Sequence, residues 1–180
     1  MRATAAPSLV DLTRTRFTED DAQRAFDTWG SNCGPGAIAA VMGMTLDEVR
    51  PHMGDFEKKR YTNPTLMFDA LKSIGRPWHK VLKPLKVPSW GLVRVQWHGP
   101  WMKEGVPIAA RYRHTHWIGG TNRDGQMLAF DINCMNVGGW VTWENWGKIL
   151  VPHLLKEAVP RADGTWSLTH VIEVDPPEVV

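Results

Sequence analysis

The sequence predicts an α+β domain in which N-terminal helices pack on an antiparallel β-sheet. Three observations lead to this fold class. An almost wholly apolar segment, Ala37–Met42, follows a glycine-rich turn and is expected to form a buried helix. Apolar and polar residues alternate over residues 93–98, as in a half-buried strand. The expected helices precede the expected strands along the chain, which is typical of α+β proteins rather than of alternating α/β folds.

Capping residues, prolines and glycines mark the expected helices. Thr18 is followed by three acidic residues, which favour a helix N-terminus. Pro35 is tolerated in a first helical turn, so the glycine-rich turn places Cys33 at or just before the start of the apolar helix. Pro51 and Gly75 are expected to end the two helices that follow. These helices are expected over residues 18–25, 34–42, 45–51 and 62–75.

The second half of the chain contains the expected strands. The turn residues Asn122–Gly125 predict a hairpin between two of them. A helix is expected over residues 142–150, with Trp143, Trp146 and Leu150 on one side. The strands are expected over residues 93–97, 106–112, 116–120, 126–133 and 166–174.

Length and composition indicate one globular domain. The chain has 180 residues, 43% hydrophobic and 22% charged, which is sufficient for a core of ordinary size. Its 21 Lys and Arg residues nearly balance 19 Asp and Glu residues, so the net charge of +2 does not indicate nucleic-acid binding. Two cysteines are too few for a disulfide framework.

The N-terminal region indicates the domain boundary and the compartment. We expect residues 1–20 to form an N-terminal arm and residues 21–180 to form a single domain. No segment approaches the roughly 18 uninterrupted apolar residues that a membrane span requires. Asp11, Arg14 and Arg16 interrupt the N-terminal region before a signal-peptide core can form. We therefore expect a cytoplasmic protein, and a protein packed into a particle would have the same features.

Cys33 is the residue on which the functional interpretation depends. At a helix N-terminus, unpaired N–H groups and the helix dipole stabilise the thiolate, which is the nucleophilic form of cysteine. The neighbouring glycines would let a substrate backbone approach closely. The alternative is a free cysteine that only fills the core among small apolar residues.

A cysteine nucleophile requires a base and a group that orients the base. His116 begins one expected strand and Asp131 ends the apolar run of the next, so a hairpin would bring both residues to one end of the sheet. Each also has an ordinary structural interpretation, as a hydrogen-bonded strand histidine and a turn-forming aspartate. Together with Cys33, the two residues favour a catalytic triad.

The segment Cys33–Ala39 resembles the Cys-Gly-Pro-x-Ala segment of papain-like cysteine peptidases of the bacteriocin-leader-processing type. The spacing from His116 to Asp131 is also similar to that family's spacing. The resemblance covers residues 23–150, and the order of its segments matters more than any single motif. The further similar segments are residues 45–49, 62–75, 105–108, 116–118, 130–131 and 141–146.

The resemblance implies a papain-like fold and a cysteine peptidase. It assigns Cys33 as the nucleophile, His116 as the general base and acid, and Asp131 as the residue that holds the imidazole. The family also places a glutamine a few residues before the cysteine to donate to the oxyanion, but this sequence has Asp27 there. Some relatives have a longer gap, so Gln23 is the candidate for this role.

Three functions are consistent with these features. The first is a peptidase that cleaves a peptide or protein substrate through a thioester and needs no cofactor. The second is a catalytically weak or inactive papain-like domain that serves as a structural or interaction component of a larger assembly, such as a phage particle. Asp27 favours this second function, since a carboxylate would repel a developing oxyanion. The third is a cell-wall peptide hydrolase with the same triad.

Two other residue groups have alternative interpretations. His114 and His116 with Cys33 and Cys134 could form a zinc site, but their spacing matches no standard zinc motif. The chain also has ten tryptophans, which either line a substrate groove or pack the core. The tryptophans concerned are Trp97, Trp101, Trp140, Trp143 and Trp146.

Overall fold

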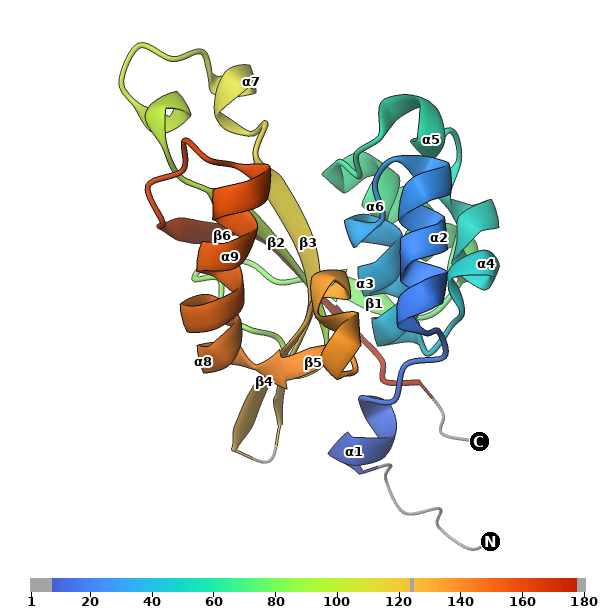
Figure 1. The fold of residues 1–180 in the computed structure, drawn as a ribbon. Helices are drawn as coiled ribbons and strands as arrows, with labels where there is room; N and C mark the ends of the chain where they lie inside the picture. Colours follow the sequence, from blue (N-terminus) through green and yellow to red (C-terminus); the bar gives the residue numbers. More distant parts are fainter. Residues whose placement is uncertain (1–7, 124, 178–180) are drawn as a thin grey trace, which may run out of the picture.

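The computed structural model describes residues 8–123 and 125–177, which form an α+β fold (Figure 1). Over these residues the centre is a six-stranded sheet with the strand order β1-β6-β2-β3-β4-β5, and all neighbouring strands are antiparallel. The predicted α+β class is confirmed. The strands are β1 (Trp78–Lys80), β2 (Gly91–Trp97), β3 (Thr115–Arg123), β4 (Gln126–Phe130), β5 (Trp140–Thr142) and β6 (Trp166–Val174).

Helices cover both faces of the sheet (Figure 1). Helices from the first half of the chain lie on one face, and the helix that follows β5 lies on the other. The first group comprises α2 (Glu19–Trp29), α3 (Cys33–Met42), α4 (Leu46–Val49), the 3₁₀ helix η1 (Arg50–Met53), α5 (Phe56–Lys59) and α6 (Pro64–Ile74). The second comprises α8 (Trp143–Asn145), the π-helical segment η4 (Trp146–Leu150) and α9 (Val151–Ala158).

Helix α3 is the buried helix that the apolar segment predicts. Every residue from Gly34 to Met42 is buried. Two buried tryptophans of the sheet region fix its surroundings through their indole N–H groups. Trp90 donates to the Val41 carbonyl at 2.9 Å, and Trp117 donates to the Thr62 carbonyl, just before α6, at 2.7 Å. The helices and the sheet are therefore joined by hydrogen bonds as well as by apolar packing.

Strand β2 differs from its prediction in one respect that matters for the site. Leu92 faces the α3 side and Val93 faces the α9 side, so the expected alternation is present. Because both faces of the sheet are covered, β2 is buried along its whole length rather than half-buried. Its polar residues Arg94 and Gln96 are only 6% and 1% exposed.

The expected strand over residues 106–112 is wrong. After β2 the chain forms the 3₁₀ helix η2 (Pro100–Met102) and then the short helix α7 (Ile108–Arg111). Pro107 is the N-cap of α7, and proline cannot donate the backbone hydrogen bond that an inner strand needs. Ile108 is 72% exposed, so the apolar residues here do not face a sheet. The strand that the family resemblance implies over residues 105–108 is absent for the same reason.

The C-terminal helix is longer than expected. It continues from Trp143 to Ala158. Pro152 cannot donate an N–H group to an α-helical ladder, but it lies in the first turn of α9, directly after the π-helical segment, where the helix tolerates it. In the described part of the chain, neither this helix nor any other is long and apolar enough to cross a membrane. Strands β1 and β5 were not predicted, since three residues are too few to show a period.

The expected N-terminal arm is partly packed. Residues 1–7 lie outside the described residues. The remainder contains the one-turn helix α1 (Leu9–Leu12), capped by the Ser8 hydroxyl. Leu12 and Phe17 are buried in the core, and Phe17 contacts Phe130 edge-on at 6.0 Å. Two residues of the described part of the arm therefore belong to the core of the domain.

Candidate active site

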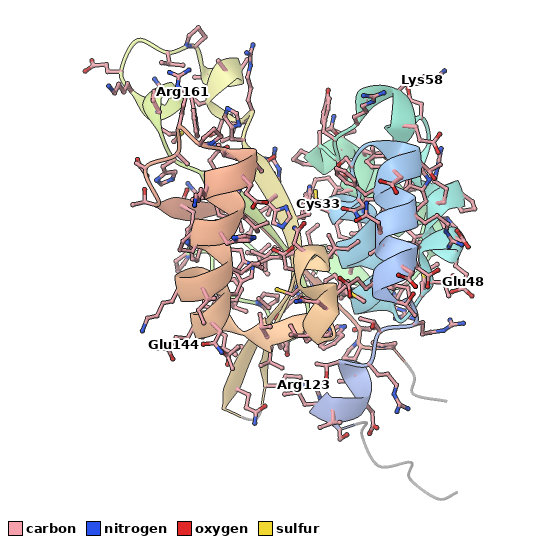
Figure 2. All side chains as sticks on the ribbon, in the orientation of Figure 1. Cys33, Glu48, Lys58, Arg123, Glu144 and Arg161 are labelled. Atoms are coloured by element: carbon pink, nitrogen blue, oxygen red, sulfur yellow. The ribbon has the colours of Figure 1, made fainter. Side chains whose placement is uncertain are left out.

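Cys33 is the first residue of α3, where the helical group meets the sheet (Figure 2). Gly30 ends α2 in a left-handed conformation, with φ of 70°, and turns the chain toward Cys33. The Asn32 carbonyl then accepts from the Gly36 N–H at 2.8 Å and closes the first turn of α3. The Cys33 thiol thus lies at the N-terminus of a ten-residue helix, as the sequence predicts.

Two glycines allow α3 to approach its neighbours closely. A Cβ atom at Gly34 would collide with the Thr62 side chain, and a Cβ atom at Gly36 would collide with the Ile132 side chain. A larger residue at either position would push the start of α3 away from these partners. The glycines therefore fix the position of Cys33.

His116 is the base nearest Cys33. It lies on β3, beside Val95 of β2 and before the point where β3 begins to pair with β4. Its Nε2 atom is 2.8 Å from Oδ2 of Asp131. The ring also hydrogen-bonds the Cys33 side chain, which leaves Nδ1 as the nitrogen on that side. The backbone N–H of Trp117 donates to the same sulfur.

Asp131 follows β4 and is completely buried. Four groups hydrogen-bond its carboxylate, two at each oxygen. Oδ2 accepts from the Trp146 indole N–H at 2.9 Å and is bonded to His116. Oδ1 accepts from the backbone and side-chain amides of Asn133 at 3.0 and 2.8 Å. A buried carboxylate held in this way has one orientation and is ionised.

The pKa shifts in the three residues favour a thiolate–imidazolium pair. Burial alone would raise the pKa of Cys33, but the hydrogen bond and charge of His116 and the Trp117 N–H lower it. Burial alone would lower the pKa of His116, but the charge and hydrogen bond of Asp131, and Cys33, raise it well above its ordinary value. Burial would likewise raise the pKa of Asp131, yet His116 and the other donors lower it.

Tryptophans hold this site from the α9 side of the sheet. Trp97 stacks on the His116 ring, with centroids 6.0 Å apart, and on Trp146, with centroids 6.1 Å apart. Trp146 is fully buried and is also the indole donor to Asp131. Of the two interpretations of the tryptophans, core packing therefore applies to Trp97 and Trp146.

The structure does not bring Gln23 into this arrangement. Its amide donates to Asp27 at 2.9 Å, one turn further along α2, and its side chain is exposed. It lines a hollow with Asn32 and Cys134, between α2 and the 3₁₀ helix η3 (Ile132–Val137). The backbone N–H of Cys33 is one of the first amides of α3, which have no intrahelical partner and can donate to a bound group.

The structure also bears on His114 and on the possible zinc site. The His114 ring packs against Trp101 in a tilted arrangement, with ring centroids 4.0 Å apart, and burial together with nearby arginines lowers its pKa. His116, not His114, is therefore the residue at Cys33. No group of three or more His, Cys, Asp or Glu residues that could hold a metal ion occurs within residues 8–123 and 125–177.

Two contributing residues were not predicted. Asn133 follows Asp131 in the Asp-x-Asn pattern of a turn in which the Asp side chain accepts the amide hydrogen two residues on, so this contact could have been found in the sequence. Trp146 lies on a separate helix, and its contact with Asp131 depends on how that helix packs. No local pattern indicates it.

A cleft of about 890 Å³ lies on the α3 side of the sheet. Its walls come from β2, β3 and β6, from residues 61–64 at the start of α6, and from the segment that contains α7. It includes Thr115, the residue before His116, and Arg94. A negative charge on Cys33 favours the protonated form of Arg94 and raises its pKa, although burial has the larger, opposite effect. The cleft therefore borders the candidate site at Thr115 and Arg94, although Cys33 and His116 are not among its lining residues.

A scan against protein-family models, a search of curated proteins and a search of solved structures found no match to the chain.

Proposed function

We propose that this protein is a papain-like thiol hydrolase that cleaves peptide bonds through Cys33, His116 and Asp131. The observation that carries the proposal is the continuous contact from Cys33 to the His116 ring and from its Nε2 atom to Asp131 at 2.8 Å. A thiolate, a base on one side of it and a buried carboxylate behind the base are the parts that nucleophilic acyl transfer requires.

The first half of the reaction forms a thioester. The Cys33 thiolate attacks the carbonyl carbon of the scissile bond, and the carbonyl electron pair moves to oxygen. The backbone N–H of Cys33, at the positive end of α3, stabilises that oxyanion. His116 donates its proton to the leaving nitrogen as the C–N bond breaks, which releases the amine product.

The second half hydrolyses the thioester. Neutral His116 takes a proton from water, and the resulting hydroxide oxygen attacks the thioester carbon. The C–S bond then breaks and restores the thiolate beside a protonated His116. Asp131 holds the imidazole in one orientation throughout and stabilises its positive charge.

The experiment is peptide cleavage by the full chain, measured by mass spectrometry on a mixed library of peptides. Cys33→Ala is expected to abolish cleavage, whereas Cys134→Ala is the matched control and should retain it. A cleavage activity that Cys33→Ala leaves intact would contradict the proposal.

A second candidate is a papain-like domain of low or no activity that acts as a component of a larger assembly. The observation that favours it is the oxyanion region, where Gln23 is bonded to Asp27 and does not contact the Cys33 site. Absence of cleavage on every peptide, together with ordinary reactivity of the Cys33 thiol, would support this candidate. Release of material from purified cell wall would instead assign the substrate to the cell wall.

A further inference from the structure

The cleft contains a buried cation that no carboxylate of the described residues neutralises. Arg94, on β2, is 6% exposed. Among the described residues, the Arg94 side chain makes one hydrogen bond, from Nη2 to the Thr115 hydroxyl at 3.1 Å, and its Nε atom is buried without a partner. No carboxylate in the described residues forms an ion pair with it. A buried guanidinium without an ion pair and with an unpaired N–H destabilises the fold unless another group binds it.

The remaining walls of the cleft favour an anion. No Asp or Glu is among the described residues that line it, whereas Lys83 and Arg113 add two exposed cations. His170, beside Arg94 on β6, is neutral at pH 7, because burial and the charges of Arg94 and Lys80 lower its pKa to about 4. It can donate or accept a hydrogen bond without adding charge. The cleft is thus cationic although the whole chain is nearly neutral.

Arg94 is also close to the proposed nucleophile. In the sheet it lies opposite Trp117, whose backbone N–H donates to the Cys33 sulfur. Its hydrogen-bond partner Thr115 directly precedes His116. The thiolate charge of Cys33 acts on Arg94. A group held by Arg94 would therefore lie next to the bond that Cys33 attacks.

We propose that Arg94 binds a carboxylate of the substrate, so that the enzyme acts on peptides with an acidic group next to the scissile bond. This inference rests on the proposed role of Cys33. The planar guanidinium has N–H donors beyond the one that the Thr115 hydroxyl accepts, and a carboxylate accepts two such donors side by side. The carboxylate is either an Asp or Glu side chain or the C-terminal carboxylate of the peptide.

The first test uses two alkylating reagents that differ only in charge. Iodoacetate carries a carboxylate where iodoacetamide carries a neutral amide, so their rate ratio at Cys33 reports attraction of a carboxylate to the site. Replacing Arg94 with Gln is expected to lower the ratio of iodoacetate to iodoacetamide rates about tenfold, because a nearby buried charge is lost. Arg94→Lys should retain most of the ratio, and the exposed Lys58→Gln is the control that should not change it.

The outcomes separate this inference from the proposed function. An unchanged ratio in Arg94→Gln, in a protein whose circular dichroism matches the wild type, would overturn the carboxylate site. Arg94→Met serves the same purpose if the Gln variant does not fold. Slow reaction of wild-type Cys33 with both reagents would instead contradict the nucleophile itself, before Arg94 is considered.

The second test identifies the source of the carboxylate. Three capped probe peptides are compared for protection of Cys33 against iodoacetamide: Ac-Gly-Gly-Glu-Gly-Gly-NH₂, its Gln counterpart, and Ac-Gly-Gly-Gly with a free C-terminus. Protection by the Glu peptide at lower concentration than the Gln peptide, lost in Arg94→Gln, assigns a side-chain carboxylate. Stronger protection by the free C-terminus assigns the terminal carboxylate. Equal protection by all three would overturn the proposal.

Discussion

The two cysteines of the chain both lie within reach of the Asp131 charge, but their surroundings shift their thiol pKa values in opposite directions. Burial acts on both thiols and disfavours both thiolates. At Cys33, His116 and the Trp117 N–H outweigh this effect and lower the pKa. At Cys134, burial and the Asp131 charge both act in the same direction and raise the thiol pKa to about 12. Hydrogen-bond donors and a cation therefore separate the candidate nucleophile from the buried Cys134.

The largest expected effect is the difference between the two thiols themselves. At pH 7 a thiol with a pKa of about 12 has roughly one part in 10⁵ as thiolate, so Cys33 should react with iodoacetamide at least ~100-fold faster than Cys134. Mass spectrometry of the two cysteine peptides measures both rates. In guanidinium chloride the rates should become equal. Equal labelling in the folded protein, or faster labelling of Cys134, would show that the comparison is wrong.

The next largest effect is expected from His116→Ala. Without the imidazole, burial dominates at Cys33, and the reaction also loses its general acid and base. Peptide cleavage should fall by about 10²- to 10⁴-fold, and Cys33 alkylation should slow toward the rate of Cys134. His114→Ala, which removes the neighbouring histidine that packs against Trp101, is the control and should leave Cys33 alkylation close to wild type.

The pH dependence of labelling should also differ between the two cysteines, because their thiol pKa values shift in opposite directions. A lowered pKa means that the Cys33 thiolate persists as the pH falls below 9, and its labelling should decline only at the lower, folded-state pKa. Labelling of Cys134 should rise only as the pH approaches about 12. His116→Ala should move the Cys33 midpoint upward, because burial then acts alone. A Cys33 midpoint at or above 9 in the wild type would contradict the ion pair.

A smaller effect is expected from Trp146→Phe, which keeps an aromatic ring against Trp97 but removes the indole donor to Asp131. A hydrogen bond to a charged group contributes about 1.5–3 kcal/mol, so the free energy of unfolding should fall by that amount. Denaturant unfolding measures it. Trp143→Phe is the matched control, since Trp143 packs on Trp146 and no hydrogen bond joins it to Asp131. Equal losses in the two variants would mean that the Trp146 hydrogen bond contributes nothing.

The sequence is informative where the chemistry is local. Glycines and Pro35 around Cys33 predict the helix start, and the hairpin turn predicts that the strands of His116 and Asp131 are neighbours. These short-range signals place Cys33 at a helix start and bring His116 and Asp131 to neighbouring strands, whereas the prediction that Cys33 meets His116 rests on the order of the three residues and on the family resemblance. Their catalytic roles stay predictions until activity is measured.

The sequence is less informative where packing decides the outcome. The burial of Arg94 depends on helices covering both faces of β2, which no pattern within the strand reveals. The same holds for Trp146, which reaches Asp131 from a helix that begins after β5. In residues 106–112 the apolar pattern indicated a strand, but Pro107 favours a turn and a short helix. Long-range packing and one backbone constraint account for these differences.

The smallest effect is expected at Gln23, the residue for which the family resemblance and the geometry disagree. The resemblance makes Gln23 an oxyanion donor, and loss of such a donor typically lowers the rate about 100- to 1000-fold. In the structure, however, its amide is bonded to Asp27 on the exposed side of α2, and the Cys33 N–H at the start of α3 is available for the oxyanion. We therefore expect Gln23→Ala to lower the cleavage rate by less than about tenfold, measured as kcat/KM on one library peptide. Asp27→Asn is the companion variant: if the Gln23 amide swings toward the oxyanion during the reaction, releasing it from the Asp27 carboxylate should raise the rate. A loss of 100-fold or more in Gln23→Ala, with the fold unchanged by circular dichroism, would restore Gln23 to the catalytic machinery and would require α2 to move when substrate binds.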